Sequence, residues 1–262
     1  MAADSDVDLN AGFYFKNSKL QLGAASRLLE ICKIKPNETV LDVGCGDGKI
    51  TAQLSKAAPK GKVIGVDASS SMIVFAKGQH PSSEFPNLEF KLGKIEDQSF
   101  KDKFDHIFSF SCFHWVRKPH EALRSLCKSL KKGGELAFLT YPQESLYYEF
   151  MQKALKAYPE YKHLSAYNTM LSIEEYQDIL KGSNMSIELF TPREIMTSHS
   201  DLDELKAFIK GWLTSFVPLP ESEHDKYINL VIEESLSYQI LSDDGRINLP
   251  YTELIIKATK LS

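Results

Sequence analysis

The sequence lacks a long apolar run: no stretch approaches the roughly 18 to 20 apolar residues that a membrane-spanning helix needs. Its opening, MAADSDVDLN, is acidic, whereas a secretory or transit peptide would be basic. We therefore expect a soluble, cytoplasmic protein that has no membrane partner.

The sequence also lacks an excess of positive charge. It has 31 basic and 35 acidic residues, which give a formal net charge of -4. Such a chain has no long-range positive field to concentrate a polyanion, and no basic stripe is interleaved with aromatic residues. Nucleic acid is therefore not an expected partner.

Closely spaced cysteines are missing as well. Cys32, Cys45, Cys112 and Cys127 form no C-x-x-C pair, and their spacing suits neither a zinc site nor a small disulfide framework. We expect reduced thiols and no metal.

What the sequence does have, in its first half, is a regular alternation of β-branched runs and amphipathic stretches. This alternation is typical of an α/β fold, in which helices cover a mostly parallel sheet. The pair Gly133-Gly134 is expected to end a helix with a left-handed turn and to lead into the fifth strand. We predict strands at 39–43, 62–67, 88–92, 104–110 and 135–141.

Beyond residue 141 the alternation loosens. Residues 201–240 are predicted to form two helices between the last two strands, and the first of them has an apolar face. These helices either form a lid over a ligand or pack as ordinary structure, because an apolar stripe fits both interpretations. The other predicted elements are helices near 145–157 and 172–182, and strands within 186–197 and at 251–259.

A glycine-rich turn follows the first predicted strand, in VLDVGCGDGKI at 40–50. A turn at the carboxyl end of such a strand is where open α/β sheets bind ligands. The pattern Gly44-x-Gly46-x-Gly48 has Lys49 in place of the third glycine of a dinucleotide-binding fingerprint. Ile50 stands where a phosphate-binding loop needs Ser or Thr. Both phosphate interpretations are weakened.

Two acidic residues flank this turn. Asp42 lies within the first strand, where a carboxylate attracts a cation and repels a pyrophosphate. Asp67 ends the second strand and is placed to accept hydrogen bonds from two vicinal ribose hydroxyls. Each could instead be an ordinary turn acid. Together they indicate a ligand with a ribose, a positive charge and no phosphate, as in S-adenosyl-L-methionine.

Three segments carry a resemblance to a known family. VLDVGCGDG resembles the first motif of class I S-adenosylmethionine-dependent methyltransferases, VIGVDAS their ribose-holding strand, and LKKGGELAF the turn before their fifth strand. The resemblance implies a Rossmann-like sheet of seven mostly parallel strands with helices on both faces and a helical insertion before the last strand. It implies a cofactor site formed by Asp42, Gly44, Cys45, Gly46, Asp67, Ala68, Met72, Ile95, Glu96 and Ser109.

Two of these positions need a comment. Met72 packs either on adenine or in the core. Lys94 stands where the family has an acidic contact to the adenine amino group, so the backbone of Ile95, or Glu96 or Asp97, is expected to replace that contact.

The segment FSFSCFHWV, after the fourth strand, indicates the acceptor. It lacks the Asn/Asp-Pro-Pro-aromatic signature of enzymes that methylate amide or adenine nitrogens. It resembles a segment of small-acid carboxyl methyltransferases, the trans-aconitate type and, more closely, the juvenile-hormone-acid type. The likeness extends to YFKNSKLQ and to PYTELIIKATK. It implies that Gln21 and Trp115 anchor a substrate carboxylate.

The chemistry suits these residue types. A carboxylic acid with a pKa near about 4 is ionised at neutral pH, so its methylation needs no general base. Gln21 and Trp115 would hold one oxygen in line with the methyl group. His114 either orients the acid or packs beside it, and would be the first candidate base for a hydroxyl acceptor.

We therefore predict an O-methyltransferase that converts a small, largely apolar carboxylic acid to its methyl ester. The few arginines favour a monocarboxylate. The alternatives are methyl transfer to an oxygen or nitrogen of a natural-product or lipid intermediate, and a non-catalytic sensor of S-adenosylmethionine. The apolar pocket is predicted to be lined by Phe13, Tyr14, Phe113, Trp212 and Phe216.

The predicted organisation is a single methyltransferase domain over residues 1–262. Residues 1–38 would form a helical segment that gates the substrate, 39–141 the cofactor-binding core, and 142–262 a substrate-side region with the helical insertion.

Overall fold

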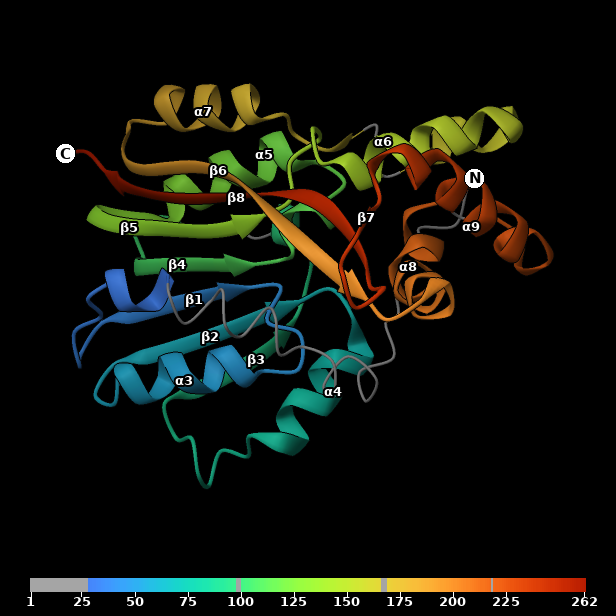
Figure 1. The fold of residues 1–262 in the computed structure, drawn as a ribbon. Coiled ribbons are helices and arrows are strands. Elements are labelled where there is room, and N and C mark those ends of the chain that lie inside the picture. Colours follow the sequence, from blue (N-terminus) through green and yellow to red (C-terminus); the bar gives the residue numbers. More distant parts are fainter. Residues whose placement is uncertain (1–27, 98–99, 166–168, 218) are drawn as a thin grey trace. The chain divides into compact units, whose positions relative to one another are not determined.

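The computed structural model describes residues 28–97, 100–165, 169–217 and 219–262 (Figure 1). By their internal contacts they form two compact units. The first contains the described residues up to Thr140, together with Glu174–Thr191 and Ile255–Ser262; the second contains Tyr141–Ile173 and Pro192–Leu254.

The strands of the described residues belong to one sheet, in the order β3-β2-β1-β4-β5-β8-β6, and β7 pairs with β8. Strand β1 is parallel to β2 and β4, β3 is parallel to β2, and β5 is parallel to β4. Figure 1 shows β8 running opposite to β5. The predicted α/β fold with a mostly parallel sheet is confirmed. The strands are β1 Thr39–Val43, β2 Lys62–Asp67, β3 Leu88–Leu92, β4 Phe104–Phe110, β5 Leu130–Thr140, β6 Met185–His199, β7 Ile240–Leu241 and β8 Ile247–Lys260.

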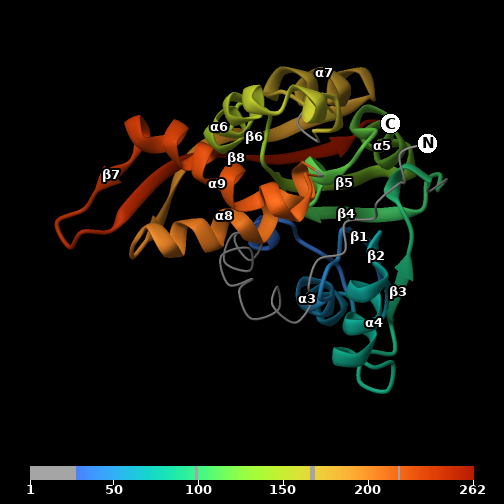
Figure 2. The ribbon, with the colours of Figure 1, turned by 90° about the vertical axis from the view of Figure 1, so that its right-hand side faces the viewer.

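Helices connect and cover these strands. In the first unit α3 and α4 lie beside β2 and β3 (Figure 2), and α5 packs on β5. In the second unit α9 packs on both α6 and α8. The α-helices are α3 Lys49–Ala57, α4 Ser70–Gln79, α5 Pro119–Ser129, α6 Leu146–Ala154, α7 Ile173–Gly182, α8 Leu202–Phe216 and α9 Glu221–Ser235. The short 3-10 turns are η1 Ile95–Asp97, η2 Phe113–Trp115, η3 Leu155–Ala157, η4 Pro159–Leu164 and η6 Leu236–Tyr238.

Within the part of the chain that the structure describes, no helix combines the length and the apolarity that are needed to cross a membrane. The two helices predicted at 201–240 are present as α8 and α9.

The strands form where the apolar residues are concentrated. Four of the five residues of β1 are buried, as in a strand covered on both faces. Strands β1 to β4 occupy the predicted ranges.

The prediction for Gly133-Gly134 is wrong in one respect. Helix α5 ends at Ser129, and both glycines lie inside β5. Gly133 has a φ of 73°, and the pairing with β4 jumps from Leu130 to Glu135. This shift in register makes the pair part of a bulge within the strand instead of a helix end. A Cβ on Gly134 would lie 2.9 Å from the carbonyl oxygen of Lys131, so this position has no space for a side chain.

Candidate active site

The topology brings the predicted cofactor residues to one edge of the sheet. The chain leaves β1 toward β2 on one side, whereas β4 lies on the other side of β1. This reversal of strand order creates the position at which open α/β sheets bind ligands. The glycine turn, η1 and η2 follow the carboxyl ends of β1, β3 and β4 respectively, and Asp67 is the last residue of β2.

The glycine turn is held against the end of β2. The N–H groups of Gly44 and Cys45 both donate to the carbonyl oxygen of Val66, at 2.8 and 3.1 Å. Gly44 and Gly46 have φ values of 71° and 52°, a region in which side chains other than that of glycine are strained. The sequence-based prediction of a tight turn at this position therefore agrees with the backbone.

Asp67 is fixed in place by the same turn. Its Oδ2 accepts a hydrogen bond from the N–H of Gly46 and its Oδ1 one from the N–H of Ser69, both at 2.9 Å. Burial raises the pKa of the Asp67 carboxyl, and these backbone N–H groups lower it. Because each carboxylate oxygen has two lone pairs, both oxygens keep the capacity to accept a ribose hydroxyl. The residues present thus fit the nucleoside that the sequence resemblance implies.

Asp42 is buried within β1 and is 2% exposed. Its Oδ2 accepts a hydrogen bond from Thr51 Oγ1 on α3 at 2.7 Å. Burial raises the pKa of Asp42 to about 7, although the Thr51 hydrogen bond lowers it. Burial therefore makes this carboxyl a weaker acid than the carboxylate that the sequence suggested.

This property gives a pH-dependent prediction. The pKa of Asp42 is about 7 in the fold against an ordinary 3.8, so the folded state binds the proton more tightly than the unfolded state. The resulting stability is complete below the ordinary pKa and is lost as the pH rises through about 7. Asp42→Asn keeps an oxygen for Thr51 and cannot ionise. We expect its free energy of unfolding to decline less between pH 5 and pH 8 than that of the wild type, by at most about 2.5 kcal/mol. Urea unfolding of both proteins between pH 5 and pH 8 measures this difference. The same pH dependence in Asp42→Asn and in the wild type would contradict the prediction.

The short helix η2 carries His114 and Trp115. Before it, Ser111 has a φ of 51°, unusual for a residue other than glycine and typical of functional sites. His114 is 6% exposed, and burial lowers its pKa to about 3, so its ring is neutral at neutral pH. The ring centroids of His114 and Trp115 lie 5.2 Å apart, and Trp115 is half-buried. A neutral imidazole of such low basicity suits packing or orientation better than proton abstraction.

The other predicted cofactor residues lie near the same strand ends. Ser109 Oγ donates to the carbonyl oxygen of Val43 at 3.1 Å and so ties β4 to β1. Met72 and Ile95 are buried, Glu96 is half-buried and Ala68 is exposed. Their contacts with a cofactor stay predictions.

The predicted apolar pocket is only partly within the described residues. Phe113 is 1% exposed, and the centroid of its ring lies 5.0 Å from the ring centroid of Phe138. Phe216 is also 1% exposed and stacks on Tyr148. The structure thus places both rings in the protein core, so their place on a pocket wall remains a prediction. Outside the description lie Phe13, Tyr14, Gln21 and the side chain of Trp212.

Two contacts of this site were missed from the sequence. Thr51 holds Asp42, and Cys112 packs on Gly44. The hydrogen bond of Thr51 could have been predicted, because Thr51 is a polar residue near the start of α3, the helix that follows the strand of Asp42. The contact of Cys112 with Gly44 has no sign in the local sequence.

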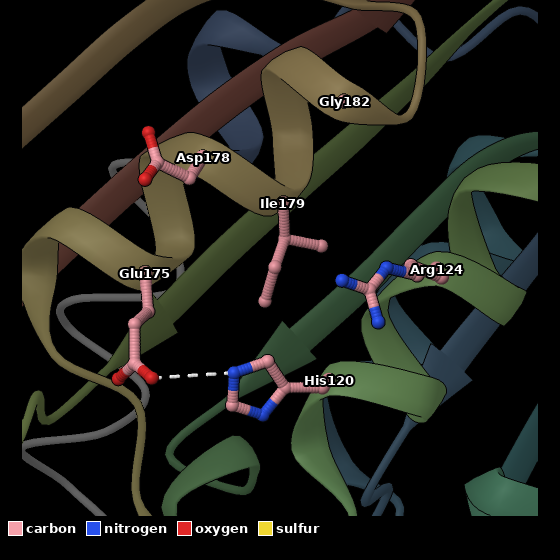
Figure 3. A pocket seen from close by; sticks show the side chains of 6 residues that line it. All are labelled: His120, Arg124, Glu175, Asp178, Ile179 and Gly182. Atoms are coloured by element: carbon pink, nitrogen blue, oxygen red, sulfur yellow. Dashed lines mark ion pairs between the residues drawn. The ribbon is translucent and has the colours of Figure 1, made fainter.

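A groove of about 340 Å³ lies between α5 and α7 (Figure 3). His120 Nε2 is 3.2 Å from Glu175 Oε1, and both side chains are almost half exposed. Exposed ion pairs of this kind contribute about 0 to 1 kcal/mol to the free energy of unfolding. The groove is made by helix faces, so it is a separate feature from the strand-end site. It is lined by His120, Arg124, Glu175, Asp178, Ile179 and Gly182.

Comparison with protein families gives a match to residues 34–202. The matching family model is described as a methyltransferase domain. It covers β1 to β6, and therefore all the strand ends described above.

Two curated relatives match to different extents. The chain is 27% identical to juvenile hormone acid O-methyltransferase of Bombyx mori over 277 aligned residues, which cover 96% of this chain and 98% of that protein. It is 36% identical to trans-aconitate 2-methyltransferase of Deinococcus radiodurans over 103 residues, 39% of this chain and 38% of that protein. The chain spans about half the length of several other curated relatives that it matches.

A solved structure shows the same fold. The YcgJ protein of Bacillus subtilis superposes with a TM-score of 0.67 at 19% identity, over 92% of this chain and 99% of that one.

Proposed function

Because this chain belongs to the methyltransferase domain family, we propose that it converts a small, largely apolar carboxylic acid to its methyl ester. The enzyme class follows from the family, and S-adenosylmethionine is the methyl donor that the family implies. The acceptor is the proposed part. The observation that carries it is the match to juvenile hormone acid O-methyltransferase over almost the whole of both chains.

The donor would be held at the strand-end site. When bound, S-adenosylmethionine supplies an electrophilic methyl group on a positively charged sulfur. Asp67 would accept the ribose hydroxyls, and its hydrogen bonds to Gly46 and Ser69 hold its oxygens in place before any ligand arrives. Because the Asp67 side chain is already held in position, less conformational entropy is lost when the ligand binds.

The acceptor side needs no proton transfer. A carboxylic acid is ionised at neutral pH, so the task is to hold one of its oxygens and to exclude water. The indole N–H of Trp115 and the amide of Gln21 would donate hydrogen bonds to the anion. The low pKa of His114, caused by burial, agrees with a reaction that has no general base.

Two of the five arginines support an acid with a single carboxylate, because each is already bound to another residue. Arg193 forms an ion pair with Glu253, which is 2% exposed, and Arg246 donates to Ser198. These two guanidinium groups therefore already have partners, which leaves fewer of the five arginines for a tricarboxylate.

The direct test is an incubation with labelled donor and a mixed library of carboxylic acids. Mass spectrometry should show acids that gain one methyl group, as esters that base hydrolyses. Donor should be consumed only when an acid is present. Base-stable methylated products would instead indicate an ether or amine acceptor, and binding of donor without turnover on any acceptor would indicate a sensor.

The predicted anchors give a second test. Trp115→Phe and Gln21→Ala each remove one hydrogen bond to a charged group, worth about 1.5 to 3 kcal/mol, so kcat/KM should fall roughly tenfold to hundredfold. His114→Asn is the comparison, because it keeps a polar side chain without an imidazole. Its kcat/KM should stay within about threefold of the wild type. A loss confined to the His114 variant would indicate a hydroxyl acceptor.

A further inference from the structure

The side chain of Cys112 fills the space in which a side chain on Gly44 would begin. A Cβ added to Gly44 would lie 2.2 Å from Cys112 Sγ and 2.3 Å from Cys112 Cβ. Contacts below 3.0 Å are essentially never seen for a real Cβ. The atoms that exclude a side chain at position 44 therefore belong to the protein itself.

The pairing of β1 with β4 creates this contact. Val43 and Ser109 are partners in the sheet, and Ser109 Oγ also donates to the carbonyl oxygen of Val43. The chain then turns at Ser111, whose φ is 51° and whose N–H donates to the carbonyl oxygen of Leu139 at 2.8 Å. This turn brings Cys112 onto the first residue after β1.

The opposite side of the glycine turn is fixed as well. The N–H groups of Gly44 and Cys45 donate to Val66, at the end of β2. The turn is thus enclosed between β2 and Cys112. A displacement of Gly44 would also displace Gly46, whose N–H is bound to Asp67.

Cys112 acts here as a neutral, space-filling group. Burial raises the pKa of its thiol, and the nearby carboxylates of Asp67 and Asp42 raise it further. Its carbonyl oxygen accepts a hydrogen bond from the N–H of Trp115 at 2.8 Å and so begins η2. One residue therefore touches both the donor-side turn and the segment predicted to hold the acid.

We propose that Cys112 is a positioning residue for the glycine turn, and that position 44 must be glycine because of the Cys112 side chain together with the positive φ of the turn, and not because of a bound ligand. The part of this proposal that concerns cofactor affinity rests on the proposed function. The part that concerns packing does not.

A double-mutant cycle tests it with two measurements, unfolding in urea without ligand and calorimetric titration with S-adenosylhomocysteine. Gly44→Ala alone should lower stability and raise the Kd about tenfold or more, because the added methyl group displaces the turn. In the double variant Gly44→Ala with Cys112→Gly, both clashing atoms of Cys112 are removed. The Kd of this double variant should return to within about tenfold of the wild-type value. The remaining difference reflects alanine at a positive φ.

Two controls make the cycle specific. In the double variant Gly44→Ala with Cys112→Ala, neither the stability nor the Kd should recover, because the Cβ of residue 112 stays 2.3 Å from the new methyl group. Cys112→Ser, which preserves the shape, should leave the Kd within about twofold of the wild type.

The outcomes separate the two proposals. If Gly44→Ala lowers stability and affinity equally with cysteine or glycine at position 112, the proposal for Cys112 is wrong. If the wild type does not bind S-adenosylhomocysteine, the proposed cofactor site is wrong. The unfolding cycle still decides the packing role of Cys112 in that case.

Discussion

Asp67→Ala is expected to raise the Kd for S-adenosylhomocysteine by at least about a hundredfold. Two hydrogen bonds between ribose hydroxyls and a carboxylate contribute about 1.5 to 3 kcal/mol each, and every 1.4 kcal/mol is a factor of about ten. The substitution also frees the N–H groups of Gly46 and Ser69, which hold the turn and the start of α4. Calorimetric titration measures the affinity.

Asp67→Asn serves as the intermediate case. It retains one acceptor oxygen but carries no charge, so its Kd should lie between those of the wild type and Asp67→Ala. Asp178→Ala removes an exposed carboxylate from α7 in the same unit, and it should leave the Kd unchanged. An Asp67→Ala protein that folds normally and binds S-adenosylhomocysteine as tightly as the wild type would falsify the assignment of the ribose site.

The second large effect is expected in the other unit. Arg193→Ala should lower the free energy of unfolding by about 3 to 5 kcal/mol, because it leaves a buried carboxylate without its cation. That carboxylate is Glu253 on β8, 2% exposed, which pairs with Arg193 on β6. For a chain of this size the melting temperature should fall by roughly 10 °C.

Two comparisons identify the cause of that loss. Arg246→Ala removes a half-buried arginine that donates to Ser198 and pairs with no buried carboxylate of the described residues, and we expect a smaller change, of at most about 1 kcal/mol. Combining Arg193→Met with Glu253→Gln removes both charges and should recover much of the stability, as replacement of buried ion pairs often does. If Arg193→Ala unfolds at the wild-type temperature, Glu253 does not depend on this partner.

Much of the first half of the fold was predictable, because its strands are short apolar runs separated by turn residues. The ranges predicted at 39–43, 62–67, 88–92 and 104–110 are those of β1 to β4. The fifth strand was less predictable. Gly133 adopts the left-handed conformation that the sequence indicates, but the same conformation serves a helix end and a strand bulge.

The second half depends more on pairing between distant segments. Strand β8 begins at Ile247, before the predicted start, and the two-residue β7 was not predicted. Ile240 and Leu241 are exposed, so no alternation of buried and exposed residues marks them. These two residues form a strand because they pair with β8.

The amino-acid sequence alone determined the order of the elements, the glycine turn and the acidic residues at the ends of β1 and β2. These are local properties, set by backbone conformation and by the spacing of apolar residues. The tertiary structure decided the raised pKa of Asp42, the packing of Cys112 on Gly44 and the burial of Phe113. Each of these depends on atoms from elements far apart in the chain, and desolvation and steric exclusion act only once those elements are packed together.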